Sequence, residues 1–272
     1  MNLQTIFGRY ISRESIVHHM DPRAKLLLSV LFMVVVFAAQ SYLALAVAAL
    51  FTFGMFFFAK ISIKQAFVSI APLAILVVFT GLLNIFFVQG GTIYFQFGII
   101  CISEQGLHQC LFIVIRLTLL LLGMSLLTLS TTTLNITDAF EKLLGPLKRI
   151  GVPAHELATM MGIALRFLPQ FATELQTIYR AQISRGANFK TNARGTFSMM
   201  VSLIVPLFTS AFRHAETLSL GMDARCYHGG ENRTSLRELH YAKRDLGGLI
   251  YLLFALACVI LVNIILIQLG WS

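Results

Sequence analysis

The sequence predicts an all-α integral membrane protein with about five transmembrane helices and a cytoplasmic coupling module of long amphipathic helices. Hydrophobic residues make up 57% of the chain and charged residues only 12%, and the mean hydropathy is +0.79. These values lie well outside the range of soluble domains. Two apolar blocks, residues 26–130 and 246–270, enclose a stretch at 131–244 that holds 14 of the 21 Lys and Arg residues. We therefore expect an N-terminal membrane domain with four spans at 1–130, coupling helices at 131–244 and a C-terminal transmembrane helix at 245–272.

The individual spans follow from length, because a helix that crosses a bilayer needs about 20 apolar residues. Candidate spans lie at 26–39, 43–59, 66–88, 106–130 and 246–270. The first two are short, and only Gln40, Ser41 and Tyr42 separate them. This spacing predicts a tight helical hairpin whose helices cross a locally thin bilayer or rely on neighbouring helices.

The distribution of positive charge predicts the orientation, because Lys and Arg in short loops stay on the cytoplasmic side. The loops at 40–42 and 89–105 contain no Lys or Arg. The opposite side carries Arg9, Arg13, Arg23, Lys25, Lys60 and Lys64. We expect the N-terminus inside and the C-terminus outside. A cleaved signal peptide is the alternative for the first forty residues, but the long charged lead and the second apolar run argue against it.

The net charge of +9 suggests anionic lipid headgroups and a protein partner rather than nucleic acid, since membrane spans surround the basic residues. The four cysteines lack the spacing of a disulfide framework or a zinc site. They are Cys101, Cys110, Cys226 and Cys258. We expect the chain to bind no cofactor or metal.

The sequence lacks three motifs of common enzyme classes. No segment fits the phosphate-binding loop G-x-x-x-x-G-K-[ST], so any function that needs the energy of ATP would require a separate ATPase. His155-Glu156 does not continue to H-E-x-x-H, and no G-x-S-x-G turn is present. We expect a non-catalytic protein.

Two long amphipathic helices are predicted inside the basic stretch, from about Pro153 to Arg185 and from about Thr196 to Arg225, because apolar residues recur there every three or four positions. The first stripe is Leu157, Met161, Ala164, Leu168, Phe171, Leu175 and Ile178. The second is Phe197, Val201, Ile204, Phe208, Ala211, Ala215, Leu218 and Met222. We expect the two helices to pack on each other, and a purely structural pair is the alternative.

Each of these helices contains a proline, Pro169 in Arg166-Phe-Leu-Pro and Pro206 in the second helix, and an interior proline bends a helix. Bent helices can cross as well as run parallel.

Both amphipathic helices end in an arginine, within Ser184-Arg185-Gly186 and within Ala224-Arg225-Cys226. An arginine there faces the negative pole of the helix dipole, so simple capping is the alternative to a functional role. Gly186 suits the left-handed residue that closes a helix. Cys226 does not, and we expect the second helix to unwind toward Gly229-Gly230. Two such ends together favour a functional role.

Two further sites carry charge at or inside the predicted spans. Arg116 lies well inside a span, where an arginine is costly enough to suggest function. It could face a partner subunit, snorkel toward the outer interface or bond to Asn84. Asp21-Pro22-Arg23 precedes the first span, where Asp before Pro is a common helix start and a partner contact is the alternative.

Taken in order, these motifs resemble the transmembrane T component of energy-coupling factor (ECF) transporters over almost the whole chain. The resemblance rests on Asp21-Pro22-Arg23-Ala24-Lys25-Leu26, Leu165-Arg166-Phe167-Leu168-Pro169 and the two arginine helix ends. Four further segments are similar to the version that several vitamin-binding subunits share. They are Arg13–Lys25, Gly90-Gly91, Ser184-Arg185-Gly186-Ala187 and Tyr227–Asp245.

The resemblance implies a scaffold in a bacterial or archaeal cell membrane. Two ABC-type ATPases would sit beneath it and bind ATP and Mg, and Arg185 and Arg225 would insert into grooves on them. A small membrane subunit would bind the substrate, a vitamin or metal ion, and several such subunits would exchange on one scaffold. The family usually has Gly where this chain has Cys226.

Two other function classes remain open from the sequence, a stand-alone channel or secondary carrier and a membrane-embedded enzyme. A carrier would show broken helices in two matching halves with polar groups at the midplane. Here the polar residues collect in one block, and the substrate cannot be identified from this chain.

Overall fold

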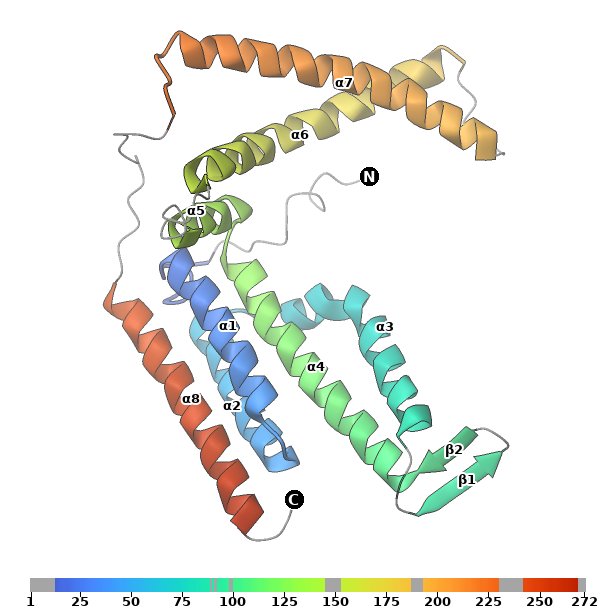
Figure 1. The fold of residues 1–272 in the computed structure, drawn as a ribbon, viewed down its shortest axis with the longest axis vertical. Coiled ribbons are helices and arrows are strands. Elements are labelled where there is room, and N and C mark those ends of the chain that lie inside the picture. Colours follow the sequence, from blue (N-terminus) through green and yellow to red (C-terminus); the bar gives the residue numbers. More distant parts are fainter. Residues whose placement is uncertain are drawn as a thin grey trace. The chain divides into compact units, whose positions relative to one another are not determined.

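A computed structural model of the chain describes residues 13–88, 90, 92–97, 100–144, 153–186, 193–229 and 242–268. The chain divides into two compact units. One comprises Gly8–Ala139 and Glu238–Ser272, and the other comprises Met1–Phe7 and Phe140–Arg237. We call the first the membrane unit and the second the coupling unit, and we describe each by itself (Figure 1).

The membrane unit is a bundle of long apolar helices that match the predicted spans within a few residues. They are α1 (Pro22–Ala38), α2 (Tyr42–Ala59), α3 (Ile63–Phe87), α4 (Glu104–Ser130) and α8 (Lys243–Gln268). The last four are each long and apolar enough to cross a membrane. The prediction of an all-α membrane protein is therefore confirmed. α1 has 17 residues, at the lower limit for a span, so the count of five remains a prediction.

Side-chain caps fix where three of these helices begin. Asp21 accepts a hydrogen bond from the Arg23 N–H at 2.9 Å, with Pro22 at the first helical position. Ser41 accepts from the Ala44 N–H at 3.2 Å, and Ser103 accepts from the Gly106 N–H. These contacts satisfy backbone donors that a helix leaves unpaired at its N-terminus.

The loop expected at 89–105 contains a small β-hairpin. β1 (Ile93–Phe97) pairs antiparallel with β2 (Ile100–Ser103), and Ile93 lies opposite Ser103. The sequence predicts this segment only as a loop without Lys or Arg between two spans. Its β-branched and aromatic residues favour strands over a structureless loop.

The core of the membrane unit lies between α1, α2, α4 and α8. Val36, Leu45, Leu252 and Val259 are at most 1% exposed. At one end of the bundle, the Asn263 side chain donates to the carbonyl of Ala38 at 2.7 Å and so ties α8 to the end of α1. Side-chain packing and polar contacts at the helix ends thus hold these four helices together.

The coupling unit contains the two long amphipathic helices, α6 (Ala154–Ser184) and α7 (Ala193–Asp223), close to the predicted bounds. α6 and α7 cross in Figure 1. A shorter helix, α5 (Thr133–Leu144), precedes them in the chain and was not predicted as a separate element; its residues up to Ala139 belong to the membrane unit and those from Phe140 to the coupling unit. Thr132 accepts a hydrogen bond from the Asn135 N–H at 3.4 Å. A threonine in this position is a sequence signal for the start of a helix.

Candidate functional site

Three polar contacts between α6 and α7 show that the two helices run antiparallel. Gln170 contacts His214, Glu174 contacts Ser210, and the Gln182 side chain donates to the carbonyl of Ser202 at 3.3 Å. The residue number rises along α6 as it falls along α7. The predicted packing of the two helices on each other is therefore observed, with one register over several turns.

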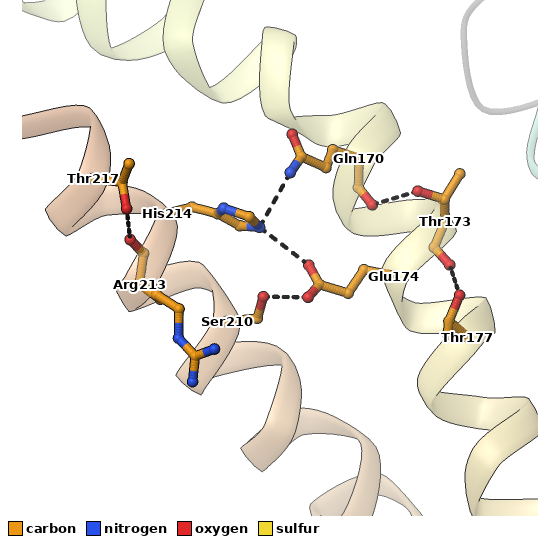
Figure 2. Close-up of polar contacts among 8 residues, drawn as sticks. All are labelled: Gln170, Thr173, Glu174, Thr177, Ser210, Arg213, His214 and Thr217. Atoms are coloured by element: carbon orange, nitrogen blue, oxygen red, sulfur yellow. Dashed lines mark hydrogen bonds and ion pairs between the residues drawn. The ribbon is translucent and has the colours of Figure 1, made fainter. Parts of the chain in front are cut away.

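Glu174 lies at the centre of the polar contacts in this crossing (Figure 2). One carboxylate oxygen accepts a short hydrogen bond from the Ser210 hydroxyl, and the other lies 3.6 Å from Nε2 of His214. Nε2 of His214 also lies 3.2 Å from Nε2 of Gln170. The carboxylate therefore joins two positions of α7 to one position of α6.

The imidazole of His214 also contacts aromatic side chains of α6. Its ring centroid lies 5.9 Å from that of Phe167 in a stacked arrangement and 6.0 Å from that of Phe171. Polar and aromatic contacts thus converge on one side chain of α7. Such a cluster specifies one alignment of two helices more sharply than apolar contacts, because a shift would leave its polar groups unpaired.

The end of α6 has the geometry that the sequence predicts. Arg185 is its last residue in right-handed conformation, and Gly186 follows with φ +84°. The Gly186 N–H donates to the carbonyl of Ile183 at 2.9 Å. Only glycine adopts this backbone conformation without steric cost.

The end of α7 has the same geometry, and the prediction that Cys226 would not close this helix is wrong. Cys226 has φ +54° and donates its N–H to the carbonyl of Asp223 at 2.9 Å. The N–H of Tyr227 donates to the carbonyl of Met222 at 3.1 Å. These two bonds form a Schellman motif, which holds a non-glycine residue in the left-handed region and ends the helix before Gly229.

The two arginines occupy equivalent positions, each directly before the left-handed residue. Ser184, Arg185, Gly186, Ala224, Arg225 and Cys226 are all exposed. Within the ranges that the structure describes, neither guanidinium has an ion pair or a side-chain hydrogen bond. Both charges are therefore available to groups outside this chain.

The antiparallel register places these arginines at opposite ends of the helix pair. Continued along the helices, the contact register puts Arg225 level with the first turns of α6, whereas Arg185 ends that helix. At a rise of about 1.5 Å per residue, the two ends are roughly 40 Å apart along the pair. Figure 1 shows the C-terminal ends of α6 and α7 on opposite sides of the crossing.

Much of each predicted apolar stripe is exposed instead of packing on the other helix. On α6, Leu157 is 41% and Met161 is 48% exposed. On α7, Ile204 is 42% and Phe208 is 60% exposed. A contact between two crossing helices covers only a short length of each, so the remaining apolar surface is free for another molecule.

Asp21-Pro22-Arg23 has a structural role within the membrane unit. In addition to capping α1, Asp21 donates its backbone N–H to a carboxylate oxygen of Asp245 at 2.9 Å. The other oxygen of Asp245 accepts from the Ala242 N–H and so caps α8. Asp245 is only 6% exposed. This role of Asp245 was not predicted, although an acidic residue in the first turn of a helix is a sequence signal for a cap.

Arg116 also has partners inside the membrane unit. Its guanidinium donates a short hydrogen bond to the carbonyl of Ala39 and lies 4.5 Å from the ring centroid of Phe112. The guanidinium of Arg116 bonds to this carbonyl and not to Asn84, the partner considered from the sequence. The Asn84 amide group donates to the carbonyl of Thr80. Arg116 therefore stabilises the end of α1.

The remaining predicted positions lie on α6 or outside the described residues. Arg166 is exposed, and Pro169 lies within a helix that continues on both sides of it. Positions named in the sequence analysis that fall outside the described residues are Arg9, Gly91, Ala187, Gly230 and the part of Tyr227–Asp245 from 230 to 241.

Comparison with known proteins agrees with this structure. Residues 13–236 match a family model described as CbiQ, cobalt transport protein. The chain is 43% identical to the energy-coupling factor transporter transmembrane protein EcfT of Thermosediminibacter oceani, over 89% of this chain and 92% of that protein. It is 42% identical to the protein of that name from Brevibacillus brevis, over 99% and 98% of the two chains. The Bacillus subtilis protein of that name is 42% identical, over 88% and 91%.

The helices and the matches together define an all-α membrane protein of a transport system. The chain belongs to the CbiQ family and is the transmembrane component of an ECF transporter. The resemblance noted in the sequence is thereby confirmed.

The end of α7 gives a first prediction, because Cys226 is held in the left-handed conformation. Cys226→Gly should stabilise the last turn of α7 by about 0.4–1 kcal/mol, since glycine adopts this conformation without strain. Gly186→Ala should destabilise the end of α6 by about 1 kcal/mol. Hydrogen exchange of the Tyr227 amide, which bonds to Met222, measures the first effect. Faster exchange in Cys226→Gly would contradict the assignment.

The crossing gives a second prediction. Glu174→Ala should destabilise the contact between α6 and α7 by about 1–3 kcal/mol, because it removes the acceptor of Ser210 and the partner of His214. Glu156→Ala, at an exposed position of the same helix, should change stability by less than about 0.5 kcal/mol. Amide hydrogen exchange in α6 and α7 distinguishes them. Equal effects of the two variants would show that the crossing does not depend on Glu174.

Proposed function

We propose that this chain is the coupling scaffold of an ECF importer. Two ABC-type ATPases bind Arg185 and Arg225, and a small substrate-binding membrane subunit binds elsewhere on the scaffold. ATP-driven motion of the ATPases passes through α6 and α7 to that subunit. The observation that supports this most directly is the pair of exposed arginine helix ends with the same backbone geometry.

The separation of the two ends fits two docking partners better than one. Arg185 and Arg225 end helices that run antiparallel, so the two guanidiniums point to places roughly 40 Å apart. Two ATPases side by side present two equivalent grooves. One scaffold with two equivalent helix ends would place one arginine in each groove.

Arginine suits this role for a chemical reason. A guanidinium presents several donors in a fixed plane and binds carboxylates and carbonyls through more than one hydrogen bond. The closing turn holds the backbone around each arginine, so the side chain is presented from a fixed helix end. A buried contact of this kind couples the position of the groove to the position of the helix.

Through the crossing of α6 and α7, displacement of one helix end changes the angle between the two helices. The Glu174, Ser210 and His214 contacts fix one point at which the helices meet. Displacement of either end by an ATPase would then change the angle between the helices, as in a pair of levers. Pro169 and Pro206 are positions at which each helix can bend.

The exposed apolar stripes supply a surface for the substrate-binding subunit. Met161 in the α6 stripe is 48% exposed, and Met200, which adjoins the α7 stripe at Val201, is 55% exposed. Flexible methionine side chains repack against different partners. This surface suits a scaffold on which several substrate-binding subunits exchange.

The proposal includes transport of a vitamin or other micronutrient. The family description names cobalt, and the names of the relatives specify no substrate. The shared vitamin version follows from the sequence resemblance. ATP and Mg would be bound by the ATPases, with no cofactor on this chain. In a bacterial or archaeal cell membrane, the N-terminus and the coupling unit would lie in the cytoplasm and the C-terminus outside.

Arginine substitutions in the reconstituted complex test the proposal. Arg185→Ala combined with Arg225→Ala should lower ATP-driven uptake at least about 100-fold, because loss of one partner of a buried charge pair costs about 2–5 kcal/mol. Arg185→Lys with Arg225→Lys should restore only part of the activity. Uptake of substrate into vesicles measures transport, and co-purification of the ATPases measures whether they still bind.

Matched controls are available on the same helices. Arg180 on α6 and Arg213 on α7 are exposed, but they do not lie at the helix ends. Arg180→Ala with Arg213→Ala removes the same charge and should leave uptake within about twofold, as expected for surface positions. Unchanged uptake in the Arg185/Arg225 variant, with both ATPases still bound, would refute the proposal.

A further inference from the structure

The membrane unit contains a partly open cavity of about 310 Å³ between α1, α2, α4 and α8. Most of its lining is apolar, including Phe32, Met55, Leu126 and Leu252. An unfilled apolar cavity of this size forfeits dispersion contacts, and water gains little in it. In a bilayer, the apolar material available to fill such a space is a lipid chain.

The cavity has a polar end and an apolar end. Lys25 lies in the first turn of α1, Ser130 is the last residue of α4, and Arg244 is the second residue of α8. Phe32 lies seven residues further along α1, which corresponds to about 10 Å. The space is therefore shaped for an amphiphile with its polar group beside these helix ends.

The polar end of the cavity holds cationic donors. The ammonium group of Lys25 donates to the carbonyls of His18 and Ser130, both at 3.1 Å, which leaves its third N–H for a ligand. Buried Asp21 and Asp245 lie nearby and offset its charge. Arg244 is exposed, and within the described ranges its guanidinium has no bonded partner.

The polar lining residues of the cavity lie at the cationic end of the bundle. Contacts between Lys25 and Ser130, and between Asp21 and Asp245, bring the ends of α1, α4 and α8 together there. That end carries Arg13, Arg23, Lys25, Lys60, Lys64, Lys243 and Arg244, whereas the connections at 39–41 and 88–103 contain no Lys or Arg. Clustered Lys and Arg at a membrane surface attract anionic headgroups.

We propose that this cavity binds one acyl chain of an anionic phospholipid, with the lipid phosphate against Arg244 and the chain running toward Phe32. Lys25, whose third N–H takes no part in its two hydrogen bonds to carbonyls, lines the same end of the cavity. A lipid bound in this way fills the space between four helices at the end where Asp21 and Asp245 join α1 to α8. It is a bound component of the membrane unit, separate from any docking at α6 and α7.

Photolabelling of the full chain tests this proposal without a transport assay. The protein is reconstituted in phosphatidylcholine vesicles doped with phosphatidylglycerol that carries a diazirine on one acyl chain, and labelled positions are found by mass spectrometry. We expect labels on Leu28, Phe32 and Leu126, all of which line the cavity. The same diazirine on phosphatidylcholine should label these positions about fivefold less.

Two pairs of variants separate the chain site from the headgroup site. Ser29→Phe places a ring in the cavity and should lower labelling of Leu126 about tenfold, whereas Val30→Phe, at an outward position that is 57% exposed, should not change it. Arg244→Gln should abolish the preference for phosphatidylglycerol. Lys243→Gln removes a neighbouring charge that does not line the cavity and should retain the preference.

Equal labelling by the two lipids would refute the anionic headgroup. Labels confined to outward residues such as Val30, Val34 and Phe37 would refute the cavity site. If Ser29→Phe does not fold, the lipid comparison and Arg244→Gln still decide the question in the unaltered bundle. These outcomes do not depend on ATPase docking, so the two proposals succeed or fail separately.

Discussion

The antiparallel crossing of α6 and α7 is the constraint on which the functional account depends. Glu174 bonds to Ser210 and faces His214, and Gln170 contacts the same imidazole. Because a shift would leave the hydrogen-bonded polar groups unpaired, this cluster specifies the register. The register in turn places Arg185 and Arg225 at opposite ends of the helix pair.

Much of this arrangement could be predicted from the sequence, since the signals are long and repeated. Continuous apolar runs gave the bundle helices within a few residues, and the three-to-four periodicity gave both amphipathic helices. Gly186 and the end of the second apolar stripe predicted that the two helices end at Arg185 and Arg225. Asp21-Pro22 proved to be a helix start, as its residue types indicate.

Other features could not be predicted, because they depend on contacts between distant segments. Asp245 joins α8 to Asp21, which is 224 positions away in the sequence. Arg116 bonds to Ala39 rather than to Asn84, and a sequence does not show which carbonyl is within reach. The three-to-four periodicity located the apolar stripes but does not show which surface covers them. From the sequence, Phe208 could therefore be either a buried core residue or the exposed residue that the structure shows. At Cys226, local residue preference gave the wrong answer because two backbone bonds outweigh the cost of a side chain at positive φ.

The distance between the two helix ends tests the central claim most directly. Spin labels on Ser184→Cys and on the native Cys226 would report it by pulsed electron resonance, after Cys101, Cys110 and Cys258 are replaced by alanine. The antiparallel register predicts a distance of roughly 35–40 Å in the full chain. A distance below roughly 20 Å would place both arginines at the same end of the pair and would contradict the account.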